Sequence, residues 1–340
     1  MKKTLAALIV AATAASANAA SVYEKDGTRI DVEGSFRLFL GKDSKDQRGD
    51  LKNNGSRLWF KANQEIGNGL SALGAVEMRF DKDTTDANSF GNPRANQLYA
   101  GFAHKDVGTL TFGRQETTLD LVQLSDFAYP FGGNNNLKDY ADKSIKFLST
   151  EWHGLSIGLD YLFGNAQKHS TATELKNGYG VSAFYNRELA QDVALSLAAG
   201  YNYVKYDDND PATTVTGTKE NAWRTAAQIT FGKAALGVEF GRKAEKLAGE
   251  TKLRGRSILV GAKYQVIDPS AVYFQYQNNQ EKQANSAKET ENKYILGVDY
   301  KLHSNVLVFV EGYRSLTKEH TAPVVKSNDT GYGVGLRVFF

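Results

Sequence analysis

The decisive stretch of this sequence is its end, Gly331-Tyr332-Gly333-Val334-Gly335-Leu336-Arg337-Val338-Phe339-Phe340. Tyr332 and every second residue after it, as far as Phe340, are apolar, whereas glycines and Arg337 lie between them. Such a repeat of two predicts a β-strand with one apolar and one small or charged face. A soluble sheet rarely ends its chain on two aromatic residues, so we expect this strand to face lipid.

Strands of the same kind recur along the whole chain. Period-two segments bounded by turn residues give roughly 16 strands, an even number that suits a closed transmembrane barrel. We therefore predict an all-β fold, a 16-stranded antiparallel transmembrane β-barrel, over residues 20–340. The expected strands are 29–40, 57–65, 70–80, 94–104, 109–115, 144–152, 155–163, 177–187, 193–206, 220–231, 234–244, 255–266, 271–280, 292–302, 305–316 and 330–340.

The connections between these segments alternate between short and long. Residues 67–69, 153–154 and 303–304 are tight turns, while polar stretches such as 41–56 and 116–143 are long. Transmembrane barrels show this asymmetry, with short turns at one rim and long loops at the other. The five prolines fall in the expected connections, as they should where strands need every backbone donor. Not every segment alternates cleanly: in 305–316 the alternate residues Leu307, Phe309 and Glu311 mix apolar and charged character.

The first 19 residues have the features of a secretory signal: Lys2 and Lys3, an apolar run, and Ala17-Asn18-Ala19. The apolar run is shorter than the roughly 20 residues of a spanning helix, so we expect cleavage after Ala19 and export. Cleavage removes two lysines and no acid from 41 basic and 38 acidic residues, leaving 39 against 38 and a charge of +1.

Composition excludes several classes of protein. A nearly neutral exported chain without a basic aromatic patch is not expected to bind nucleic acid. The absence of cysteine excludes a disulfide framework. Mean hydropathy is −0.43, and no apolar run reaches the length of a membrane helix, which is compatible with a barrel that turns only alternate residues outward. We expect no cofactor and no metal site.

The longest connection, residues 116–143, is called the third loop here. It carries Glu116, Asp120 and Asp126 among its acids, and its middle, 127–133, is too apolar for a loop in open solvent. Long structureless loops usually have a function. We expect this loop to fold into the barrel, with its apolar side on the wall and its carboxylates in the bore.

Basic side chains are expected on the opposite wall. If apolar residues face lipid, a set of five basic residues from the first four strands points inward: Arg37, Arg57, Lys61, Arg79 and Arg94. Together with the acidic loop they would create a transverse field at a constriction, over a range limited by a Debye length of about 8 Å.

At these residues the chain resembles the general diffusion porins of Gram-negative bacteria, and within them the major porins of Pasteurella and Haemophilus. The similar stretches are Val22 to Gly27, Asp31 to Gly34, Arg57 to Lys61, Asp106 to Arg114, Tyr129 to Gly133 and the terminal phenylalanine.

The resemblance implies a homotrimer in the outer membrane, in contact with lipid and lipopolysaccharide, that passes small hydrophilic solutes and ions by passive diffusion. It implies that Asp126 and Arg57 line the constriction and that Arg114 receives a neighbour's loop. Lys143 or Lys146 would replace a sixth-strand arginine of the family. The chain departs from the family at Ser35 and Pro130, where the family has a lysine and a second loop acid.

Other functions remain open at this point. A substrate-specific channel would need an aromatic or dedicated binding path through the bore, and a plugged adhesin or structural barrel would leave little trace in the sequence. An enzyme is not expected. A hydrolase needs a histidine near its nucleophile, and the histidines lie at predicted strand ends, turns or loops: His104, His153, His169, His303 and His320. Asp207, Asp208 and Asp210 lack the later glutamate of a calcium loop.

Overall fold

The computed structural model describes residues 20–80, 90–166, 174–207, 217–247 and 250–340, so the expected signal segment lies outside the described residues. Its elements are β1 Ala20–Lys25, β2 Thr28–Lys42, β3 Asp50–Asn53, β4 Ser56–Gly67, β5 Leu70–Phe80, β6 Pro93–His104, β7 Gly108–Glu116, the 3₁₀ helix η3 Thr118–Val122, β8 Tyr140–Ser149, β9 Leu155–Phe163, β10 Glu174–Ala190, β11 Val193–Asp207, β12 Thr218–Phe231, β13 Ala234–Leu247, β14 Glu250–Ile267, β15 Ser270–Gln283, β16 Glu289–His303, β17 Val306–Glu319 and β18 Val325–Phe339.

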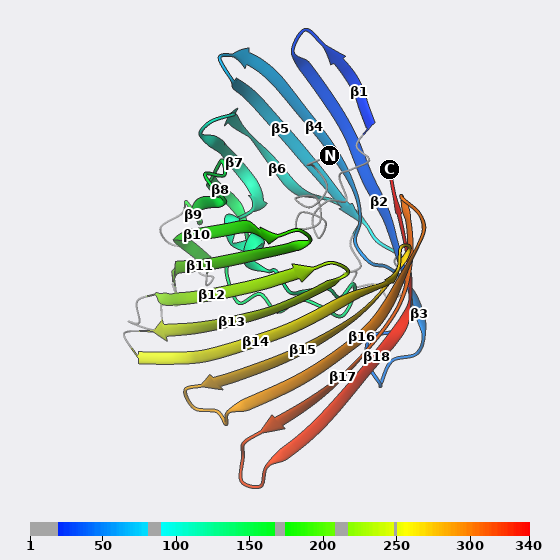
Figure 1. Cartoon of the computed structure of the whole chain (residues 1–340). Coiled ribbons are helices and arrows are strands. Elements are labelled where there is room, and N and C mark those ends of the chain that lie inside the picture. The colour runs from blue at the N-terminus through cyan, green and yellow to red at the C-terminus, as the bar shows by residue number, and fades with distance from the viewer. Residues whose placement is uncertain (1–19, 81–89, 167–173, 208–216, 248–249) are drawn as a thin grey trace.

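The strands follow one another around a closed ring, as Figure 1 shows. Each strand from β4 to β18 pairs antiparallel with the next, and β18 pairs with β2, which pairs in turn with β4. The ring is therefore a closed 16-stranded antiparallel barrel, and this confirms the prediction. Closure leaves no free sheet edge in the ring, so the backbone groups of its strands are paired without help from solvent.

The two ends of the described chain meet on β2. Phe339 pairs with Ser35, and Phe340 exchanges two backbone hydrogen bonds with Gly34, of 2.8 and 3.1 Å. β1 then continues along the same strand, with Ala20 opposite Val32. β1 and β18 thus lie end to end and together form one full-length partner of β2.

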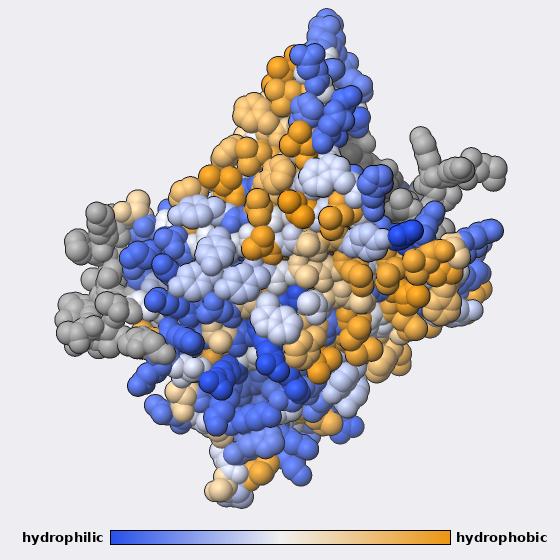
Figure 2. Space-filling model, turned by 60° about the vertical axis from the view of Figure 1, so that its left-hand side comes forward, coloured by the Kyte–Doolittle hydropathy of each residue, from blue (hydrophilic) through white to orange (hydrophobic). Residues whose placement is uncertain are grey.

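The burial pattern is the reverse of that in a soluble sheet. In β15, Gln275 and Gln277 are 0% and 2% exposed, whereas Val272 and Phe274 are 40% and 41% exposed. In β18, Tyr332 and Val334 of the predicted apolar row are 61% and 46% exposed. Apolar residues therefore face outward and polar ones inward. Figure 2 shows hydrophobic side chains gathered across the middle of the visible face, with hydrophilic ones toward its lower end.

The tight turns have the geometry that their residues favour. Asn68 and Gly69 have φ of 54° and 79°, and His153 and Gly154 have φ of 50° and 90°. Positive φ at both central residues is typical of the type I′ hairpin turn, which matches the twist of antiparallel strands. None of the described helical segments is long and apolar enough to cross a membrane.

The sequence misplaced some element boundaries. It missed β1 and the short β3, which pairs with the outer half of β2 where the prediction had a loop over 41–56. Pro93 was expected in a connection and is instead the first residue of β6, a position where a missing donor is tolerated.

Candidate functional site: the bore and its loop

The third loop lies against the inner wall of the barrel. Its backbone and side chains form hydrogen bonds with Asp160 of β9, Glu239 of β13 and Glu311 of β17. All three belong to the buried polar row, while their outward neighbours Leu159, Val238 and Val310 are exposed. The contacts therefore place the loop on the side of the wall that faces the bore.

The base of the loop is held by η3. The Thr118 amide donates to both carboxylate oxygens of Asp160, at 3.0 and 3.1 Å, and Ser182 Oγ donates to Thr118 Oγ1 at 2.7 Å. Leu119 and Val122 are fully buried, and full burial of such side chains contributes about 1.5–3 kcal/mol each. They pack in a cluster with Leu137, Ala198, Ala222 and Ala226.

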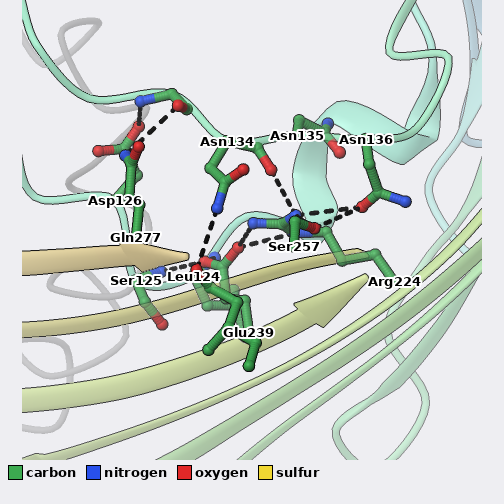
Figure 3. Close-up of polar contacts among 12 residues, drawn as sticks. Leu124, Ser125, Asp126, Asn134, Asn135, Asn136, Arg224, Glu239, Ser257 and Gln277 are labelled. Atoms are coloured by element: carbon green, nitrogen blue, oxygen red, sulfur yellow. Dashed lines mark hydrogen bonds and ion pairs between the residues drawn. The ribbon is translucent and has the colours of Figure 1, made fainter. Parts of the chain in front are cut away.

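A buried ion pair holds the middle of the loop, as Figure 3 shows. Arg224 of β12 and Glu239 of β13 form the pair, and their side chains are 1% and 0% exposed. The other carboxylate oxygen of Glu239 accepts from the amides of Leu124 and Ser125 at 2.7 and 2.6 Å. Arg224 also donates to the Asn134 carbonyl and to Asn136 Oδ1. The pair therefore joins the outgoing and returning halves of the loop to the wall.

The tip of the loop is held by a second carboxylate. Glu311 accepts from the amides of Tyr129 and Phe131 at 2.7 and 2.9 Å, and from Tyr273 Oη at 2.7 Å. Tyr129 Oη donates to Asp299 Oδ2 at 2.8 Å. Because carboxylates accept from backbone amides more strongly than neutral groups do, these contacts fix the tip to β16 and β17.

Aromatic rings fill the space beneath the tip. The ring of Tyr129 stacks on that of Phe309 with centroids 4.5 Å apart, and Phe131 meets Phe39 edge-on at 5.6 Å. Phe39 and Phe309 are only 2% and 3% exposed. The mixed row of β17 thus has a physical reason: Phe309 supports the tip and Glu311 binds its amides.

Arginines follow one another along the part of the inner wall formed by β18, β2, β4, β5 and β6. The register pairs Arg337 of β18 with Arg37 of β2, Arg57 of β4 with Arg79 of β5, and Arg79 with Arg94 of β6. Arg57 is joined to this series through Ser35, which is its register partner on β2. We call these five residues the arginine row.

Glu77 neutralises the middle of the arginine row. It is fully buried and lies 3.4 Å from Arg57 Nη1 and 3.0 Å from Arg79 Nη2. Asn96 and Gln97 also donate to it. Arg79 Nη2 lies 3.9 Å from Glu116 Oε1, so the row meets the third loop at this point.

The predicted lysines lie at different places. Lys61 forms an ion pair with Glu33 on the wall. Lys146 lies opposite Asp160 in the register and donates to the Glu116 carbonyl at 2.9 Å. The structure does not bring Lys143 to the arginine row. Lys143 is on the other face of β8 from Ser144 and Lys146, and it donates to the Gly164 carbonyl.

Two predicted acids have specific surroundings in the loop. Burial, together with the negative charges of Glu116 and Asp139, raises the pKa of Asp120 to about 7. Burial also raises the pKa of Asp126, while hydrogen bonds from the Gly133 and Ala128 amides oppose the change. Asp126 accepts from these amides at 2.7 and 3.4 Å. It therefore caps the turn of its own loop, and an exposed position in the bore remains a prediction.

Arg114 faces the outside of the barrel. It pairs in register with Leu98, which is 60% exposed, and it forms a 2.9 Å ion pair with Asp142. The residue is therefore available to a neighbouring surface rather than to the bore.

Sequence reasoning missed Arg224, Glu239, Glu311 and Arg337. One signal for the path of the loop was present, in glycines of the inward row. A Cβ on Gly200 would lie 2.9 Å from Leu137 Cδ1, and one on Gly261 would lie 2.1 Å from the Ser125 carbonyl oxygen. Absent side chains on the wall thus mark where the loop passes. The same close approach occurs at Gly158, Gly180, Gly237 and Gly241.

The described residues contain no group of three His, Cys, Asp or Glu side chains placed to hold a metal ion; Asp208, Asp210 and His169 lie outside them. A Gly-x-Ser-x-Gly spacing occurs at 154–158, but Ser156 lies within β9 and pairs with Phe184. A nucleophile elbow requires a sharp turn between a strand and a helix, so this spacing does not form one.

Known proteins resemble this chain throughout its length. The family model described as Gram-negative porin matches residues 4–320. The major outer membrane protein of Pasteurella multocida strain Pm70 is 41% identical over 357 residues, covering 100% of both chains. A second Pasteurella multocida major outer membrane protein is 40% identical, also with 100% coverage of both chains.

Solved structures share the fold at lower identity. In-vitro folded OmpT of Vibrio cholerae superposes with a TM-score of 0.73 at 20% identity, covering 94% of this chain and all of that chain. A trimer form of the same protein gives a TM-score of 0.72 at 19% identity, covering 93% of this chain and all of that chain. OmpF of Salmonella typhi, in complex with daunomycin, gives 0.67 at 17% identity, covering 94% and 100% of the two chains.

Proposed function

Because this chain belongs to the Gram-negative porin family and forms a channel in the bacterial outer membrane, we propose that it passes small hydrophilic solutes and ions by passive diffusion, without cofactor or turnover. The proposal rests above all on one observation, the burial pattern of the strands. Residues of the inward row, such as Gln275, are polar, while residues of the outward row, such as Phe274, are apolar. A hydrated path for polar solutes requires such a wall.

The constriction in this proposal lies between the third loop and the arginine row. Glu116 and Asp120 supply negative charge on the loop side, and Arg57 and Arg79 supply positive charge on the wall. The 3.9 Å approach of Arg79 to Glu116 supports this placement. Solutes passing here would exchange hydration water for fixed charges, which favours polar solutes over apolar ones.

A substrate-specific channel is the weaker alternative. It would need aromatic faces along the bore, and the inward aromatic cluster that contains Phe39 and Phe309 packs against the loop tip. Phe39, Phe131 and Phe309 are 2%, 5% and 3% exposed, so these rings pack the loop and offer little surface to a solute.

We also propose that residues 1–19 are removed on export and that the mature chain, residues 20–340, assembles as a homotrimer in contact with lipid and lipopolysaccharide. The outward ion pair of Arg114 and Asp142 supports a contact on the outside of β7 and β8. Exposed Leu98 on β6 and Phe112 on β7 make the neighbouring outer surface apolar, as either lipid or a second barrel requires.

Planar-bilayer recording of the refolded chain tests the proposed function. We expect discrete conductance steps in KCl that rise in proportion to salt concentration, together with liposome swelling that falls smoothly with the size of an added sugar. Absence of conductance steps would contradict the pore. Saturation of flux by one sugar at low concentration would favour the substrate-specific alternative.

A further inference from the structure

Arg37 and Arg337 are directly opposite each other on β2 and β18, on the row that faces the bore. Opposed residues of an antiparallel pair have Cβ atoms roughly 4.5–5.5 Å apart, and like charges at this separation repel. A bore wall that only has to be hydrated does not require two guanidinium groups at one register position. A neutralising partner is therefore the first thing to look for.

The described residues supply no such partner. Neither arginine has a carboxylate within ion-pair distance among them. Arg37 donates through Nε to Ser35 Oγ at 2.8 Å, and Arg337 Nε is buried without a hydrogen-bond partner, which leaves only the two terminal nitrogens of Arg337 to face the bore. Both side chains are partly exposed. Their outer N–H groups thus remain available to a molecule in the bore.

The nearest acids are already engaged elsewhere. Glu77 is bound by Arg57, Arg79 and two amides, and Glu311 is bound by the loop tip and by Tyr273. Arg57 and Arg79 also lie near enough to act electrostatically on Arg37. The positive charge at this end of the arginine row is therefore balanced only in part, by the more distant charges of Glu77 and Glu311.

The position of Arg337 is set by packing. Its guanidinium carbon lies 4.5 Å from the centre of the Tyr129 ring and 5.7 Å from that of Phe309. Stacking on aromatic faces orients a guanidinium and leaves its edge free for two parallel hydrogen bonds. The loop tip, through the ring of Tyr129, thus orients the guanidinium of Arg337 to donate hydrogen bonds.

We propose that Arg37 and Arg337 form an oxyanion subsite in the bore, beside the loop tip, that binds the phosphate group of phosphorylated solutes during their passage. This deepens the proposed channel function and rests on it. A phosphate carries a charge of about −1.5 to −2 at neutral pH, so one phosphate balances both guanidiniums, whereas a carboxylate balances only one. Its several oxygens can also accept from both forks at once.

The test is block of the chloride current of single channels by inorganic phosphate at pH 8. We expect phosphate to reduce the current at millimolar concentration and acetate to have little effect. Arg337→Gln and Arg37→Gln should each raise the half-blocking concentration about tenfold, as expected for loss of a charge-assisted pair of hydrogen bonds. Arg337→Lys should restore only part of the block, since lysine keeps the charge and loses the fork.

Arg94→Gln is the matched control, because it removes an equal charge from the other end of the same row. We expect it to leave the half-blocking phosphate concentration within twofold of that of the unaltered channel. If Arg94→Gln weakens the block as much as Arg337→Gln does, the effect is a general field and the subsite is refuted. Equal block by acetate and phosphate would also refute it. Conductance in KCl without phosphate tests the channel itself. A protein that forms no pore shows no conductance steps, whereas a pore without the subsite conducts normally and is not blocked by phosphate.

Glucose 6-phosphate, with glucose as its comparator, identifies the solute class. Block by the phosphate ester and not by the sugar supports a subsite for phosphorylated solutes. Block by neither, in channels that conduct normally, overturns it.

Discussion

Replacement of Glu239 by glutamine should loosen the third loop. The side chain is fully buried and binds Arg224, Leu124 and Ser125 at once. Glutamine has nearly the same shape and retains an acceptor for the two amides, but it leaves Arg224 buried without a counter-charge. Removing one partner of a buried ion pair costs about 3–5 kcal/mol.

That cost can be relieved locally. Because the bore is hydrated, release of the loop would let water reach Arg224, whereas unfolding the wall would break strand pairing as well. The penalty should therefore appear as a shift in the equilibrium between attached and released loop. At about 1.4 kcal/mol per factor of ten, and allowing for the retained acceptor, we expect a shift of about 100-fold.

Hydrogen exchange at the Leu124 and Ser125 amides measures this shift, since both amides are protected only while Glu239 accepts from them. Exchange should be about 100-fold faster in Glu239→Gln, whereas Glu245→Gln, which alters a half-exposed carboxylate on the same strand, should change it little because exposed pairs contribute at most about 1 kcal/mol. The double variant Arg224→Met with Glu239→Gln should recover part of the protection. Exchange within threefold of the unaltered protein in Glu239→Gln would refute the reasoning.

Three further outcomes are expected. Because the pKa of Asp120 is raised to about 7, its negative charge is lost as the pH falls through 7. Reversal potentials in a KCl gradient should therefore become more anion-selective between pH 8 and pH 6. Asp120→Asn should abolish this change, whereas Asp142→Asn, outside the bore, should not. Glu311→Ala removes the acceptor of the tip amides and should increase single-channel conductance and current noise, whereas Glu319→Ala, which is exposed at the end of the same strand, should alter neither. Arg114→Glu places like charges beside Asp142 and should lower the temperature at which oligomers dissociate in detergent; an unchanged temperature would argue against this surface as the contact.

The barrel could be predicted because the sequence pattern that specifies each of its strands is local. Alternation of apolar and polar residues identifies a strand without knowledge of its partner, so the terminal strand and most others were located. The predicted strands were too short where they extend into the loops: β14 begins at Glu250 rather than 255, and β18 at Val325 rather than 330. Beyond the apolar belt both faces are polar, so the alternation disappears although backbone pairing continues.

The bore was predictable only in part. The inward arginines followed from alternation, and Arg337 was visible on the charged row of the terminal strand without being assigned to the bore. The loop contacts were not predictable, because Glu239 and Leu124 are 115 residues apart and Glu311 and Tyr129 are 182 apart. No local sequence pattern predicts contacts between residues so far apart in the chain. The role expected for Asp126 stays a prediction, since a sequence cannot distinguish a bore carboxylate from one that caps its own turn.

The placement of the acids changes how the charge of this channel should be understood. The formal charge of residues 20–340 is near zero, which suggests that positive and negative charges balance in the bore. However, Glu239 and Glu311 bind the backbone of the third loop, and a carboxylate that accepts from amides offers less of its field to passing ions. In the arginine row, Glu77 neutralises Arg57 and Arg79, while Arg37 and Arg337 have no carboxylate partner among the described residues. Acids thus fix the shape of the constriction while arginines set much of its field, so ion preference depends on which charges are already engaged rather than on their total number.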